Sequence, residues 1–208
     1  MGAASMNDAI RVPLIQMAFA AALALLAGAA AGETPDGAAD TTERHMNGET
    51  REKPDSVTRL EAAYGGPSEA GFGSAVFHAT LRDTDNLTQA ALSTYRTFVG
   101  KLWERHGEPA WMGPWKEVYA RPTGVKPDIT TELRGIADHD TRLSVPMILD
   151  NIEDAEAARA ALSAAFDDLA VTELRAFNLG DGEALSGLLV AGRRGASGDA
   201  TFLVFLMD

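Results

Sequence analysis

The chain has 208 residues, of which 46% are hydrophobic, so it can form one domain with an ordinary core plus extensions. Its formal net charge of −12 argues against nucleic acid as a partner, because a phosphate-binding surface needs clustered Lys and Arg. The chain has no cysteine, which excludes disulfides, a thiolate nucleophile and a lipid anchor on cysteine.

Residues 1–31 have the pattern of a secretory signal peptide. Arg11 precedes an apolar run over residues 12–26, and small residues follow, with cleavage expected after Ala29 or Ala31. The run is short for a membrane-spanning helix, although an uncleaved N-terminal anchor helix is the alternative. We therefore expect a periplasmic or secreted protein with no membrane insertion after signal cleavage.

Residues 32–72 are poor in large apolar side chains and rich in Gly, Pro, Thr, Asp and Glu. Such a segment buries too little surface to offset the entropy lost on ordering it, so we predict a flexible acidic tether. Within it, residues 56–64 can form a short helix with apolar residues on one side. His45 also lies in this segment, where we expect no metal-binding role for a lone histidine.

Residues 73–208 are predicted to form a single folded domain. Residues 73–81 alternate between apolar and polar side chains, which indicates a half-buried strand. A turn follows, and Asn86 is placed to cap the next helix. That helix is predicted over residues 87–106, because its apolar residues recur at helical spacing, and Gly107 and Pro109 end it.

The middle of the domain carries weaker signals. Residues 115–120 and 129–136 are strand candidates, and so are residues 143–149, where Pro146 favours an edge position or a bulge. A second helix is expected to begin near Asp150 or Asn151, with an acidic first turn. Its buried side is predicted to consist of Ala155, Ala158, Leu162, Ala165, Phe166 and Leu169.

The last part of the chain reads as three strands joined by two tight turns, at residues 172–179, 184–191 and 202–207. The second and third strands are apolar on both alternating faces, which is typical of strands covered on both sides. The first is more mixed and suits a position nearer an edge.

We therefore predict an α+β fold, with a mostly antiparallel sheet and two packing helices in the order β-α-β-β-α-β-β-β. This order is analogous to a ferredoxin-like arrangement with an added C-terminal hairpin. An analogy at this level carries no function.

An aromatic, proline-rich segment at residues 108–115 is the strongest candidate for a binding surface. Trp and Arg are enriched where proteins contact partners, and Met adapts to irregular surfaces. The alternative is that the tryptophans fold back as a lid over a small core. The predicted ligand- or partner-binding residues are Trp111, Met112, Trp115, Tyr119 and Arg121.

A metal site is the competing hypothesis. Asp83 and Asp85 directly follow an apolar strand, where two carboxylates can bind a divalent cation and one can act as a nucleophile. His139, between Asp138 and Asp140, or His78 would complete the site. The alternative for the two aspartates is an ordinary turn before a helix.

These patterns favour an exported cell-envelope binding or interaction protein without catalytic activity and without a cofactor, whose protein or small-molecule ligand is of unknown identity. The alternative is a metal-dependent hydrolase using Asp83, Asp85 and His139, with His78 as a further candidate catalytic residue. A third possibility is a structural envelope component that self-associates through an exposed strand.

Overall fold

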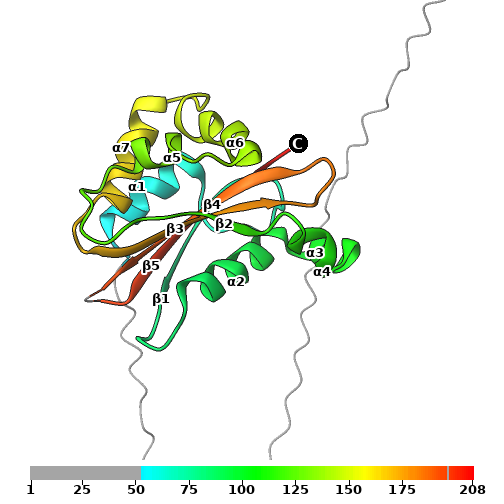
Figure 1. Cartoon of the computed structure of the whole chain (residues 1–208), viewed down its shortest axis with the longest axis horizontal. Helices are drawn as coiled ribbons and strands as arrows, with labels where there is room; N and C mark the ends of the chain where they lie inside the picture. Colours follow the sequence, from blue (N-terminus) through cyan, green and yellow to red (C-terminus); the bar gives the residue numbers. More distant parts are fainter. Residues whose placement is uncertain (1–52, 196) are drawn as a thin grey trace, which may run out of the picture. The chain divides into compact units, whose positions relative to one another are not determined.

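The computed structural model describes residues 53–195 and 197–208 (Figure 1). The predicted signal peptide, His45 and the tether up to residue 52 lie outside these residues. Within the described part of the chain, no helix is long and apolar enough to cross a membrane.

A five-stranded sheet forms the centre of the domain, with the strand order β1-β5-β4-β3-β2. Every neighbouring pair in it is antiparallel, which confirms the predicted α+β class. The more specific analogy with a ferredoxin-like arrangement is not confirmed. The strands are β1 (Gly73–Thr80), β2 (Lys116–Ala120), β3 (Val171–Gly180), β4 (Ser186–Arg194) and β5 (Asp199–Met207).

Helices cover both faces of this sheet, so the domain has three layers (Figure 1). One face is covered by α1 (Asp55–Tyr64), α5 (Ile129–Arg134), α6 (His139–Leu149) and α7 (Ala155–Phe166). The other face is covered by α2 (Leu87–Val99), α3 (Lys101–His106) and α4 (Glu108–Met112).

The inner strands are buried on both sides, as their sequences predict. In β4, Leu188 and Val190 belong to the core beneath α1 and α7, whereas Leu189 and Ala191 belong to the core beneath α2. Successive side chains of a strand point to opposite faces, so a strand between two helical layers needs apolar residues at both parities.

Two predicted strands are helices instead. Residues 129–136 contain α5 and residues 143–149 lie in α6, each capped by an aspartate whose side chain accepts a backbone N–H bond. A short apolar run does not separate strand from helix. The buried residues of α6 show helical spacing, since Thr141, Val145 and Ile148 are buried while Pro146 is exposed.

Three helix boundaries also differ from the predictions. The helix predicted over residues 87–106 is divided at Gly100, whose φ is 57°. The second predicted helix begins at Ala155 rather than near Asp150, because Asp154 accepts the bond from the backbone N–H of Ala157. Of its predicted buried side, Ala158, Leu162, Ala165 and Phe166 are buried, Ala155 is only partly buried, and Leu169 lies beyond the helix and is 84% exposed.

Helix α1 corrects the predicted tether. Val57, Leu60 and Tyr64 are buried in the core, so residues 55–64 belong to the folded domain. Their apolar side covers the sheet, and the burial that offsets the ordering entropy becomes visible only in the tertiary structure. The Asn86 cap is confirmed, because its side chain accepts bonds from the backbone N–H groups of Thr88 and Gln89.

Candidate functional site: the free edge of strand β2

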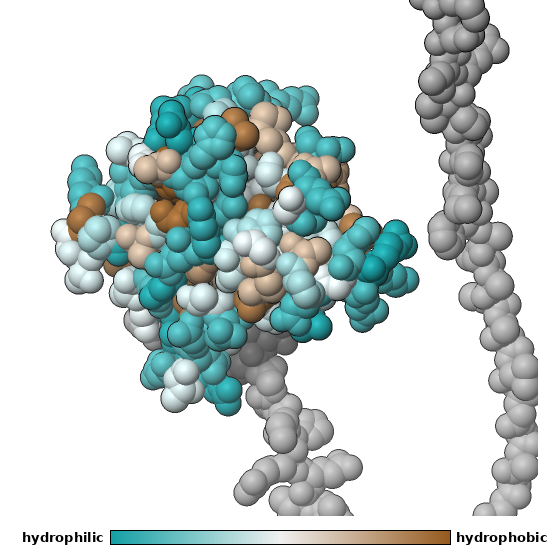
Figure 2. Space-filling model, turned by 45° about the vertical axis from the view of Figure 1, so that its right-hand side comes forward, coloured by the Kyte–Doolittle hydropathy of each residue, from teal (hydrophilic) through white to brown (hydrophobic). Residues whose placement is uncertain are grey.

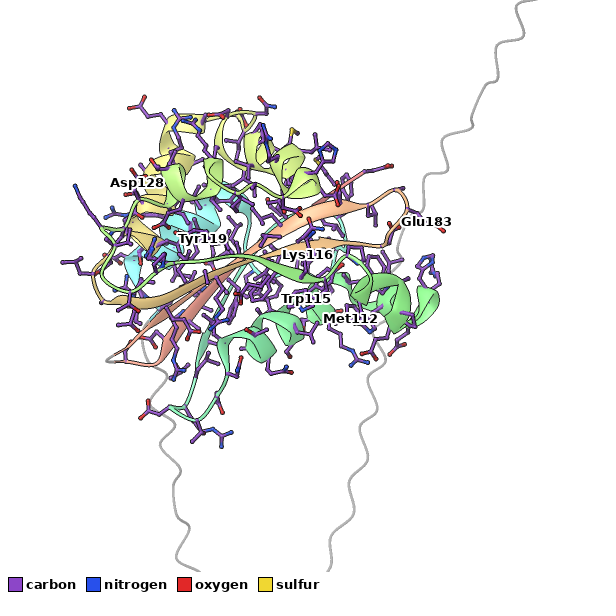
Figure 3. All side chains as sticks on the ribbon, in the orientation of Figure 1. Met112, Trp115, Lys116, Tyr119, Asp128 and Glu183 are labelled. Carbon is purple, nitrogen blue, oxygen red and sulfur yellow. The ribbon has the colours of Figure 1, made fainter. Side chains whose placement is uncertain are left out.

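Strand β2 is the last strand on one side of the sheet and lies at the front of the molecule in Figure 3. It pairs with β3 through Lys116 opposite Asn178 and Ala120 opposite Arg175, with a register shift between Glu117 and Tyr119. Within the described residues, no strand pairs with its other edge.

The end of β2 presents a backbone donor to this open edge. The backbone N–H of Arg121 donates to the carbonyl oxygen of Leu174 in β3, at 2.9 Å. Because N–H groups alternate in direction along an antiparallel strand, the N–H of the exposed Ala120 points away from β3. Such an edge is a template for pairing with another extended chain.

Apolar side chains flank the edge on both faces of the sheet. Met112 and Trp115 are partly buried against the core beneath α2, and Tyr119 is partly buried against the core beneath α5 and α7. Lys116 stands between them with its side chain 57% exposed (Figure 3). We call Met112, Trp115, Lys116, Tyr119 and Ala120 the β2 edge surface.

The distribution of hydrophobic residues over the visible surface also favours the strand edge as the binding site. In the view of Figure 2 the surface is mostly hydrophilic, with separate hydrophobic spots rather than one extended patch. A flat apolar interface is therefore not evident on that face, whereas a strand edge needs only backbone groups and a few side-chain contacts.

Trp111 does not belong to this surface. It is 1% exposed, and its indole N–H donates to the carbonyl oxygen of Leu102 at 3.3 Å. It packs edge-on against Tyr95 and parallel to Trp103, with ring centroids 6.3 and 6.2 Å apart. The alternative, in which both tryptophans fold back over a core, therefore holds for Trp111, whereas Trp115 is only partly buried.

Trp115 joins the same aromatic cluster from the edge. Its ring stacks on Phe177 at 4.6 Å and on Tyr95 at 5.8 Å. The Tyr95 hydroxyl donates to the carbonyl oxygen of Gly180, and burial raises the pKa of this phenol. The cluster thus packs against the Trp115 ring through several contacts, while the residue as a whole is only partly buried.

Arg121 has an internal structural role rather than the predicted partner contact. Its guanidinium is 6% exposed and donates two bonds of 2.7 Å to the carboxylate of Glu132, which is 8% exposed. It also donates to the carbonyl oxygen of Phe166 at the end of α7. Arg121 therefore ties β2 to α5 and α7 and presents no charge to a partner.

Tyr119 interacts with α5, and Lys116 interacts with the N-terminus of α6. Burial and the charge of Glu132 raise the pKa of the Tyr119 phenol. The Lys116 ammonium pairs with Asp138, the cap of α6. Burial opposes ionisation of Asp138, but the bonds from Lys116 and Thr141 outweigh it and lower the pKa of this carboxyl.

The residues of the predicted metal site do not meet. Asp83 is fully exposed, and Asp85 is bonded to Arg82, an interaction that lowers the pKa of the Asp85 carboxyl. They lie in the turn before α2, whereas His139 begins α6 on the opposite face of the sheet.

The two places also lie at opposite ends of the strands. Arg193 donates to the carbonyl oxygen of Asp85 and is opposite Glu173 in β3. Lys116 pairs with Asp138, the cap next to His139, and is opposite Asn178 in the same strand. Five residues of strand correspond to about 17 Å. Asp83, Asp85 and His139 therefore cannot form one metal site. Nor does any other group of three His, Asp or Glu side chains in the described residues have the required arrangement.

His78 and His106 are also apart from the edge surface. Burial lowers the pKa of His78, partly offset by Asp199 across the strand pair, and its Nδ1 atom has no hydrogen-bond partner among the described residues. His106 is exposed at the end of α3, with its ring 6.1 Å from that of Trp111.

Sequence reasoning missed Lys116 and Ala120. The signal for Ala120 is present in the chain, because a short strand before Pro122 is a typical edge strand. Which edge of β2 stays open depends on strand order, which local patterns do not specify.

In comparisons with known proteins, no family model, curated protein or solved structure matches this chain.

Proposed function

We propose that this chain is an exported cell-envelope interaction protein without catalytic activity, and that it binds an extended segment of a partner protein along the β2 edge surface. The observation that carries this function is the free edge of β2, where the backbone N–H of Ala120 points outward next to Trp115 and Tyr119. Export is supported by the signal-peptide pattern of residues 1–31.

An extended peptide suits this edge for two reasons. Its backbone can continue the ladder of hydrogen bonds, which supplies affinity without dependence on sequence. Its alternate side chains would contact Met112 and Trp115 on one face of the sheet and Tyr119 on the other, which supplies selectivity.

Rigidity of the edge adds to the support. The ring of Trp115 stacks on Tyr95 and on Phe177, and Arg121, which follows Ala120, is held by its buried pair with Glu132. A pre-ordered surface loses less conformational entropy when a partner binds.

Photo-crosslinking tests this function in the cells that make the protein. A photoreactive amino acid replaces the exposed Thr123, three residues beyond Ala120, in the wild type and in Ala120→Thr and Ala120→Pro backgrounds. Ala120→Thr keeps the outward N–H, whereas Ala120→Pro removes it and leaves the bond from Arg121 to Leu174 in place. We expect the same protein adduct in the first two and about fivefold less in Ala120→Pro, since one backbone hydrogen bond contributes about 1 kcal/mol.

The same probe at Leu169, which is 84% exposed and lies in the connection from α7 to β3, reports background crosslinking. Circular dichroism checks that the Ala120→Pro protein is folded. An undiminished adduct in the folded Ala120→Pro variant would refute binding at this edge.

The intact mass of the purified protein tests export, because it should correspond to cleavage after Ala29 or Ala31.

A further inference from the structure

A second surface lies between α1 and α7, which are side by side on one face of the sheet (Figure 1). A groove of about 770 Å³ separates their outer sides. Alanine side chains form most of its walls, so another helix can approach the backbones closely. These are Ala62 and Ala63 of α1 and Ala157, Ala160 and Ala161 of α7.

The two helices run in opposite directions. The hydroxyl of Tyr64, the last residue of α1, donates to the carbonyl oxygen of Ile148, near the end of α6 and before the start of α7. The C-terminal end of α7 leads into Val171, the first residue of β3. Val171 pairs with Arg194, the last residue of β4, at the end of the sheet where β1 also ends. The C-terminal end of α1 therefore lies beside the N-terminal half of α7.

This arrangement gives the groove opposite charges at its two ends. Arg59 lies five residues, or about 7.5 Å along the helix, before Tyr64, toward the C-terminal end of α7. Glu153 and Asp154 lie at the N-terminal end of α7. Among the described residues, neither Arg59 nor Glu153 takes part in an ion pair, and both are exposed.

We infer that this groove is the interface of a two-fold symmetric homodimer. The two-fold axis lies in the plane of the interface, at right angles to the length of the groove. It places the Arg59 end of one copy over the Glu153 end of the other, and symmetry repeats the contact. A second copy thus supplies both complementary charges at once. The α1–α7 pair of one copy then faces the α1–α7 pair of the other, and the small side chains at the interface allow the facing helices to approach closely.

Charge exchange at the groove tests this interface in the full chain. Sedimentation equilibrium between about 5 and 200 µM should give a dimer for the wild type. Arg59→Glu and Glu153→Arg each place like charges together twice, and each should weaken dimerisation at least tenfold. The double variant R59E/E153R restores opposite charges and should return dimerisation to within about threefold of the wild type.

Two further variants separate this interface from general effects of charge. Glu156→Arg makes the same change one turn along α7 at a residue that does not line the groove, and it should dimerise like the wild type. Ala62→Trp fills the groove from an exposed position and should produce a folded monomer.

A wild type that is monomeric at 200 µM would overturn the inference. So would a dimer that survives Arg59→Glu and Ala62→Trp, because that result would assign self-association to another surface such as the β2 edge. Failure of R59E/E153R to recover the dimer would overturn the pairing of Arg59 with Glu153. The crosslinking from position 123 and its loss in Ala120→Pro depend on none of these residues, so the two proposals fail independently.

Discussion

Single side chains decide which parts of the aromatic segment remain available to a partner. Trp111 and Arg121 are buried, and Trp115 and Tyr119 keep part of their surface exposed. The buried pair of Arg121 with Glu132 stabilises the domain only as a complete pair, because removing one partner leaves a charge without compensation.

Replacing Arg121 by Met should lower the free energy of unfolding by about 3–5 kcal/mol, the usual cost of an unpaired buried charge. The double variant Arg121→Met with Glu132→Gln should recover part of this loss, since it removes the buried carboxylate of Glu132. Asp167, 3.6 Å from the Arg121 guanidinium, is more exposed and keeps the bond from the backbone N–H of Ile129. Urea unfolding of the wild type, both single variants and the double variant measures the effect. An unchanged midpoint for Arg121→Met would show that the pair contributes nothing.

His78 makes stability depend on pH. Its folded pKa lies below the ordinary value, mainly because burial disfavours the charged ring, while Asp199 and Glu61 favour that charge and Lys53 opposes it. The unfolded chain therefore binds the proton first, near pH 6.5. The stabilisation is complete above pH 6.5 and is lost as the pH falls from there through the folded pKa.

Replacing His78 by Asn removes this titration. Urea unfolding at intervals between pH 7.5 and 5 should show a smaller slope of stability against pH for His78→Asn than for the wild type. The difference is at most about 1.4 kcal/mol per pH unit, the limit for one proton. Equal slopes would mean that His78 titrates alike in the folded and unfolded chains.

At the scale of elements, helix α7 packs on the sheet through a contact that only glycine permits. A Cβ atom on Gly192 of β4 would lie 2.8 Å from Cδ1 and 3.0 Å from Cε1 of Phe166. The ring of Phe166 is fully buried, so it has little room to move.

Gly192→Ala should therefore reduce stability by about 1–3 kcal/mol, the usual cost of overpacking. Adding Phe166→Leu should make the double variant more stable than the sum of the two single losses predicts, because the smaller side chain relieves the clash. Thermal unfolding of the four proteins gives the coupling, and strict additivity would exclude this contact as the cause.

At the scale of the whole domain, helical layers on both faces leave the strand edges and the outer sides of the helices as its surfaces. The β2 edge and the α1–α7 groove lie on different elements, so a dimer formed through the groove leaves each β2 edge open. Two copies would then present two identical edges, and a partner with repeated extended segments would gain affinity from binding both.

Local chemistry made a large part of this fold predictable from the sequence. The alternation of apolar and polar residues predicts strand β1, and apolar residues at both parities predict the inner C-terminal strands. Glycine-containing turns and the Asn86 cap follow from residues whose conformation or side-chain bonds act on the nearby backbone. These signals act within a few residues, so they do not depend on the rest of the chain.

The tertiary structure decided the remainder. Residues 129–149 form two helices because their buried side chains, such as Leu133 and Ile148, meet the core at helical spacing. Within the aromatic segment, Trp111 is inside because it lies in α4, which packs against α3 and β3, whereas Trp115 directly precedes the edge strand β2 and is only partly buried. Burial and strand order arise from contacts between distant segments, and a sequence pattern read locally contains neither.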